Sequence, residues 1–145
     1  MTGHRVRPAV LLVVCVVALA GCGTVEGEDP DLPRVATVAT AGDGTGGLIT
    51  LSEAAERRLG IATAPVATGS AGLVVPYAAL VYEVDGRTTV FAETEPLTYQ
   101  RTPVTVASRS GDQVVLTAGP PAGTEVVTVG AAELVGIETG LDGEE

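Results

Sequence analysis

The sequence predicts a mainly β fold: a small antiparallel β-barrel or sandwich with one short α-helix, preceded by a signal peptide and a flexible tether. Two observations support the β fold. After Gly60, β-rich runs recur about every ten to twelve residues and are separated by Gly and Pro turns, which is typical of antiparallel barrels and sandwiches. Within them, Asp85-Gly86 lies between two such runs and indicates a hairpin. No heptad run is present, so no coiled coil is expected.

The N-terminus has the pattern of a secretory signal. Arg5 and Arg7 precede an apolar run from Ala9 to Ala20, which is too short to span a bilayer. The run ends in Leu19-Ala20-Gly21-Cys22, which resembles a bacterial lipobox. The resemblance implies cleavage before Cys22, a diacylglyceryl thioether on its sulfur, and a lipid anchor at the extracytoplasmic face of the cell membrane. The alternatives are an ordinary signal peptide or an uncleaved anchor.

The chain is expected to contain one domain. We expect residues 1–21 to form the signal peptide, 22–47 the lipid-anchored tether, 48–139 the β-domain and 140–145 a disordered acidic tail. The tether is rich in Gly, Thr, Ala, Asp, Glu and Pro and sustains no helical or strand period. Its clustered carboxylates have the chemistry of a calcium site, but the prolines among them favour an extended, solvated spacer.

Composition excludes several function classes. The 145 residues include 18 acidic and 8 basic ones, a formal net charge of −10, so nucleic acid is not an expected partner. The chain has no Lys or Trp, and its one histidine, His4, lies in the predicted signal. We therefore expect no enzyme, no cofactor and no metal site. A carboxylate enzyme using Glu93 and Glu95 on one strand face is a weaker interpretation than the solvent side of an edge strand.

One helix is predicted from Leu51 to Leu59. Thr50 and Glu53 have the spacing of a capping box, and Ser52 is a second candidate cap. Apolar residues recur on one face at helical spacing, which predicts that this face packs against the sheet. Gly60 supplies the left-handed stop.

The strands follow Gly60. The run from Ile61 to Thr68 contains Pro65, which predicts an edge or a bend. Asp85-Gly86 predicts a two-residue type I′ turn, with positive φ at both residues. In the strand after this turn Val90 and Phe91 are successive, so only one of them is expected to face the core. Further strands are expected at 73–75, 101–107, 113–117 and 125–129.

Several short motifs occur in a fixed order. They are Val75-Pro76-Tyr77-Ala78-Ala79-Leu80, Thr89-Val90-Phe91-Ala92, Arg101, Val104, Gly111, Gly119, Gly123, Val126-Val127 and Gly130. This order resembles the C-terminal part of the periplasmic adaptor subunits of tripartite efflux pumps, the membrane fusion proteins of the HlyD type. Upstream, Leu51-Ser52-Glu53 and Leu59-Gly60-Ile61-Ala62-Thr63 look like the segment that precedes the first barrel strands of heavy-metal adaptors. The resemblance covers roughly residues 48–135 and implies the membrane-proximal β-domain.

The chain also departs from the family pattern. Full adaptors insert a lipoyl-like domain and a long helical hairpin between the two segments, whereas this chain passes from Val66 to Leu73 through a few small residues. The methionines that bind metal in copper-exporting adaptors have no counterpart. The resemblance therefore implies an accessory subunit that acts by contact and does not by itself bridge two membranes.

The expected function is that of a lipid-anchored, adaptor-like accessory subunit of an efflux transporter of ABC or RND type. Its expected partners are the membrane, the transporter permease and further copies of the chain. Candidate contact residues are Arg57, Arg58, Arg87 and Arg101, with ordinary surface charge as the alternative. A second hypothesis is a free-standing lipoprotein module that binds cell-wall polymer or a secreted partner. That module would need exposed aromatic rings, for which Tyr77, Tyr82 and Tyr99 are available.

Overall fold

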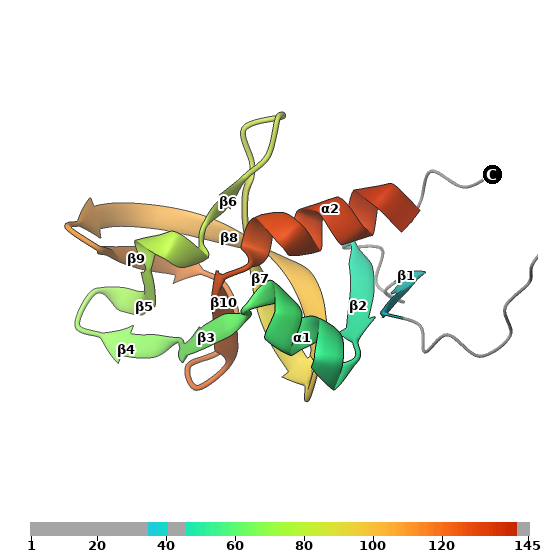
Figure 1. Cartoon of the computed structure of the whole chain (residues 1–145). Coiled ribbons are helices and arrows are strands. Elements are labelled where there is room, and N and C mark those ends of the chain that lie inside the picture. The colour runs from blue at the N-terminus through green and yellow to red at the C-terminus, as the bar shows by residue number, and fades with distance from the viewer. Residues whose placement is uncertain (1–34, 41–45, 142–145) are drawn as a thin grey trace, which may run out of the picture. The chain divides into compact units, whose positions relative to one another are not determined.

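The computed structural model describes residues 35–40 and 46–141, and Figure 1 shows how their elements are arranged. In chain order these are β1 (Ala36–Thr40), β2 (Gly47–Leu51), α1 (Glu53–Leu59), β3 (Ala62–Pro65), β4 (Ala67–Gly69), β5 (Gly72–Pro76), the 3₁₀ turn η1 (Tyr77–Ala79), β6 (Val81–Tyr82), β7 (Thr88–Glu95), β8 (Thr98–Ser110), β9 (Gln113–Ala118), β10 (Glu125–Val129) and α2 (Ala131–Leu141). Neither α1 nor α2 has the length and apolar character needed to cross a membrane.

The strands form one antiparallel, nearly closed sheet, which confirms the predicted fold class. The main order is β3-β10-β7-β8-β9-β5-β4, with β2 added to β8, β1 to β2 and β6 to β7. The two ends of this order, β3 and β4, are halves of one segment separated only by Val66. The N–H of Val66 donates to the carbonyl of Thr124, and its carbonyl accepts from the N–H of Gly123, both at 2.8 Å. The bend predicted near Pro65 therefore closes the barrel.

The core lies on both faces of β7. Val90 packs in the barrel interior, in a cluster that includes Leu116, whereas Phe91 packs with Tyr99 and Leu134 in a second cluster beneath α1 and α2. Both Val90 and Phe91 are fully buried. The expectation that only one of them faces the core was wrong, because the two helices cover the second face of the strand.

Helix α1 forms close to the predicted position. The hydroxyl of Ser52 accepts a hydrogen bond from the N–H of Ala55 at 3.2 Å, and Gly60 ends the helix with a φ of 66°. The cap is thus Ser52 and not Thr50, whose hydroxyl lies 3.3 Å from that of Thr98 across the β2–β8 pair. Thr50 is in a strand because its neighbours fill the second core cluster.

The hairpin between β6 and β7 is present, but its turn is not the predicted type I′. The N–H of Gly86 donates to the carbonyl of Glu83 at 3.0 Å, and the N–H of Glu83 donates to the carbonyl of Arg87 at 2.9 Å. Gly86 has a φ of 86°, whereas Asp85 does not have a positive φ. This pattern fits a three-residue loop, a type I turn followed by a glycine bulge.

Two elements lie where the sequence predicted no strand or helix. β1 (Ala36–Thr40) lies inside the segment expected to be a tether and pairs with β2 over its whole length. Helix α2 was not predicted, and it includes Gly140 of the expected tail. Residues 1–34, 41–45 and 142–145, which include the whole predicted signal peptide and much of the predicted tether and tail, lie outside the described residues.

The turn between β4 and β5 is short and requires glycine. Gly69 and Gly72 are direct cross-strand partners on either side of Ser70-Ala71. Gly72 has a φ of 142°, and a Cβ atom at this position would lie 2.4 Å from the carbonyl oxygen of Leu116. A larger residue would therefore force β5 away from β9.

Candidate functional site

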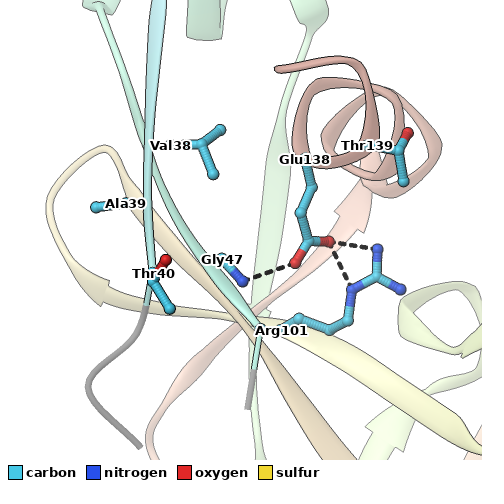
Figure 2. Close-up of a pocket in the computed structure, with 8 residues that line it drawn as sticks. Val38, Ala39, Thr40, Gly47, Arg101, Glu138 and Thr139 are labelled. Carbon is cyan, nitrogen blue, oxygen red and sulfur yellow. Dashed lines mark hydrogen bonds and ion pairs between the residues drawn. The ribbon is translucent and has the colours of Figure 1, made fainter. Parts of the chain in front are cut away.

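A pocket of about 440 Å³ lies where β1, β2, β8 and α2 meet (Figure 2). Arg101 of β8 and Glu138 of α2 are its charged residues. The other lining residues are small or apolar: Val38, Ala39, Thr40, Gly46, Gly47 and Thr139. The chemistry that this pocket offers depends on how its two charges are used.

Arg101 is held between two glutamates. Its Nε donates to Glu138 Oε2 at 2.7 Å, and its other amino groups pair with Glu138 and with Glu83 at the start of the β6–β7 loop. The second oxygen of Glu138 accepts from the N–H of Gly47 at 2.8 Å, as Figure 2 shows. The guanidinium also lies over the buried ring of Phe91, 5.1 Å from its centroid. The cluster therefore ties α2, β2 and the β6–β7 loop to β8.

The charges of this cluster are satisfied within the protein. Burial opposes ionisation of Glu83, but hydrogen bonds from Arg101 and Thr89 outweigh it, so the pKa of Glu83 lies below its ordinary value. Burial also opposes the charge on Arg101, yet its hydrogen bonds to Glu83 and Glu138 hold its pKa above the ordinary value. Arg101, expected as a partner contact, is thus paired within the protein, and a contact between Arg101 and a partner stays a prediction.

The other predicted contact residues lie on the surface. Arg57 pairs with Glu53 on α1 at 3.6 Å, and Arg87 pairs with Asp85 in the β6–β7 loop at 2.6 Å. Arg58 is exposed, and no carboxylate within the described ranges 35–40 and 46–141 pairs with it. A partner contact at Arg57, Arg58 or Arg87 stays a prediction. The predicted lipidation site, Cys22, lies outside the described residues.

The carboxylates considered for an enzyme do not form a matched pair. The register between β7 and β8 shifts between Glu93 and Glu95, so the regular alternation of side chains is interrupted there. Glu93 accepts a hydrogen bond from the N–H of Leu97 at 3.2 Å and thereby supports the β7–β8 turn. Across the part of the chain that the structure describes, no cluster of three or more His, Cys, Asp or Glu residues is placed to hold a metal ion.

A third group of residues, Tyr77, Tyr82 and Arg109, was not predicted from the sequence to lie together. The ring centroids of Tyr77 and Tyr82 lie 6.4 Å apart, and the guanidinium of Arg109 lies 3.6 Å from the centroid of the Tyr77 ring. Tyr82 is 61% exposed. Tyr99, by contrast, is buried and donates its hydroxyl to Glu56 at 2.8 Å. Two of the three tyrosines therefore gather on the surface beside a cation.

The β5–β9 pairing brings this group together from distant parts of the chain, so no local pattern marks it. Tyr77 follows β5 directly, and its N–H donates to the carbonyl of Asp112 in the β8–β9 turn at 2.8 Å. This bond places η1 beside Arg109, which lies far along the chain. Partial desolvation and the neighbouring Tyr77 raise the pKa of Tyr82, so its phenol remains neutral at physiological pH.

Comparison with known families gives a match for the segment that contains these residues. Residues 72–133 match the family model described as RND MFPs, C-terminal permuted SH3 domain. The match covers less than half of the chain. The matched segment begins with β5, takes in every strand to β10 and ends in the first turn of α2. It contains Arg101 and the tyrosine cluster, whereas α1 and the barrel-closing strands β3 and β4 precede it.

The match confirms the C-terminal part of the sequence-based resemblance. MFP domains of this type belong to membrane-associated periplasmic adaptors of RND transporters, a family without catalytic activity. The upstream part of the resemblance, from Leu51 to Thr63, lies outside the matched residues and stays a prediction. No curated protein and no solved structure matches the chain significantly.

Proposed function

We propose that this protein is a lipid-anchored, extracytoplasmic accessory subunit of an RND efflux transporter and that it acts by contact with the permease. The single observation that carries the proposal is the MFP domain at residues 72–133. The match to RND adaptors favours an RND permease over an ABC permease as the partner. The proposal needs no catalytic residue, and it agrees with the internal pairing of Arg101, Glu83 and Glu138.

The proposed anchor also suggests how the domain is presented. The described fold begins at Val35, whose carbonyl accepts a hydrogen bond from the N–H of Ser52 at 3.1 Å. A coil formed by the 12 residues between Cys22 and Val35 would span roughly 20 Å. Lipid chains on Cys22 would raise the local concentration of the domain at the membrane, so a weak contact with a permease would suffice.

Two measurements test the proposal. Mass spectrometry of the purified full-length chain should find a diacylglyceryl group on Cys22, and Cys22→Ala should release the protein from the membrane fraction. Tagged wild-type protein, solubilised in mild detergent, should copurify with an RND permease that is identified by its peptides. An unmodified Cys22 would overturn the anchor, and copurification with an ABC permease would overturn the transporter class.

A second function is favoured by a separate observation, the exposed ring of Tyr82 next to Tyr77. Exposed aromatic rings can stack on sugars, so the chain could instead bind cell-wall polymer as a free-standing module. Sedimentation with purified, insoluble cell wall distinguishes the two functions. Under the adaptor proposal the protein should stay in the supernatant, whereas loss of the protein to the pellet, reversed by Tyr82→Ala, would favour the wall-binding function.

A further inference from the structure

Tyr77, Tyr82 and Arg109 lie together where η1, β6 and the end of β8 meet, and we name them the tyrosine–arginine patch. We propose that this patch docks an extracytoplasmic loop of the transporter permease, a loop that presents a carboxylate beside apolar side chains. The inference rests on the proposed function and names the surface through which it would act.

Arg109 is one of two arginines in the described ranges that form no ion pair with a carboxylate. Arg57, Arg87 and Arg101 each pair with a carboxylate, whereas Arg58 and Arg109 have no such partner within residues 35–40 and 46–141. An unpaired cation on the surface of an acidic protein can gain an ion pair from a partner without breaking an internal one. Charge complementarity therefore points to a carboxylate on the occupant.

Arg109 differs from Arg58 because its guanidinium is held in place. The guanidinium lies 3.6 Å from the centroid of the Tyr77 ring, and its Nε donates to the carbonyl of Gly111 at 3.2 Å. The two terminal amino groups, which can bind a carboxylate in bidentate fashion, donate no hydrogen bond and form no ion pair within residues 35–40 and 46–141. A side chain that is already ordered loses less conformational entropy on binding, so this cation is prepared for a partner.

The aromatic part of the patch supplies the contact area. Tyr82 is 61% exposed, and Val84, two residues further along the same hairpin, is fully exposed. Figure 1 shows that the β6–β7 hairpin projects from the rest of the sheet, where a partner can reach it. Tyrosine and arginine are enriched at the centres of protein interfaces, where a few residues carry most of the binding energy.

The same geometry disfavours two other occupants. A sugar chain needs open ring faces, but the guanidinium of Arg109 covers one face of Tyr77 and leaves Tyr82 as the more open ring. A second copy of the chain carries the same net charge of −10, and the resulting repulsion opposes close association. A protein loop with one well-placed carboxylate fits the patch better than either.

Site-specific crosslinking in the full-length, membrane-bound protein tests the inference. The photoreactive residue benzoylphenylalanine is placed at position 82, where it keeps an aromatic ring, and at position 58 as the matched control. We expect capture of the permease from position 82 and, in the fragment spectrum, a linked peptide that contains Asp or Glu. Arg109→Ala and Arg109→Lys should each lower the yield about tenfold, because Lys lacks the bidentate edge, while Arg58→Ala should change it less than about twofold.

Each other outcome overturns the inference. Capture of the permease from position 58 alone would reject the patch and leave the adaptor function standing. Capture of a second copy, or of a muramidase-sensitive product, from position 82 would replace the occupant. Absence of the permease at both positions, together with failed copurification, would reject the adaptor function as well. Circular dichroism confirms that the variants are folded, and a crosslink yield insensitive to an increase in salt from about 0.1 to 0.5 M would reject the ion pair.

Discussion

Arg101→Ala should destabilise the fold strongly. The side chains of Arg101, Glu83 and Glu138 are 13%, 20% and 11% exposed, so the substitution leaves two carboxylates largely buried without their cation. Removal of one partner from a buried ion pair costs about 3–5 kcal/mol. Because the cluster retains some contact with solvent, we expect the lower end, about 3 kcal/mol. Urea unfolding followed by far-UV circular dichroism measures the change in the free energy of unfolding.

Two control variants separate the loss of pairing from the loss of packing. The triple variant Glu83→Gln, Arg101→Met, Glu138→Gln removes all three charges while it keeps similar volumes, and it should be within about 1 kcal/mol of the wild type. Arg57→Ala, which breaks an exposed pair, should cost less than about 0.5 kcal/mol. A cost below about 1 kcal/mol for Arg101→Ala, or a triple variant no more stable than the single one, would refute the reasoning.

Three further predictions follow from the local geometry. Ser52→Ala should lower the free energy of unfolding by about 1 kcal/mol in urea, because it removes the α1 cap, and Ser52→Asp should retain most of it. Gly72→Ala should cost more than about 2 kcal/mol in the same assay because of its close carbonyl contact, whereas Gly136→Ala on the open face of α2 should stabilise by about 0.5–1 kcal/mol; equal effects would contradict this. The pKa of Glu83 is lowered in the folded state, so its stabilising contribution is present above its ordinary pKa of 4.5 and is lost as pH falls through the folded value. Urea unfolding at pH 7 and pH 3 should therefore show a smaller loss for Glu83→Gln than for the wild type, and an equal loss would contradict the assignment.

Local signals predicted the parts of the fold that short segments determine. Gly60 marked the end of α1 because a left-handed residue is needed there, and Pro65 marked the bend because it cannot donate to a strand ladder. The position of the β6–β7 hairpin followed from Asp85-Gly86, although the turn type did not. Two- and three-residue loops can share this dipeptide, and the pairing of Glu83 with Arg87 decides between them.

Long-range packing determined what the sequence did not reveal. Helix α2 lacks a clear amphipathic period, and it forms because Leu134 and Glu138 reach the second core cluster and Arg101 respectively. The internal role of Arg101 was missed for the same reason, since both of its glutamate partners lie far away in the sequence. The tyrosine–arginine patch depends on the register between β5 and β9, which aligns Pro76 with Gln113. None of these contacts leaves a local pattern.

The β4–β5 turn has a consequence for how the fold could accept an insertion. Gly69 and Gly72 face each other across two adjacent strands, so an insertion at Ser70-Ala71 would leave and re-enter the barrel through points only about 5 Å apart. An arm whose own ends lie close together could be gained or lost at this point while the barrel pairing stays unchanged. The strand pairing of the barrel therefore does not depend on the length of the chain between β4 and β5, and a long arm at this position could be exchanged without a change in that pairing.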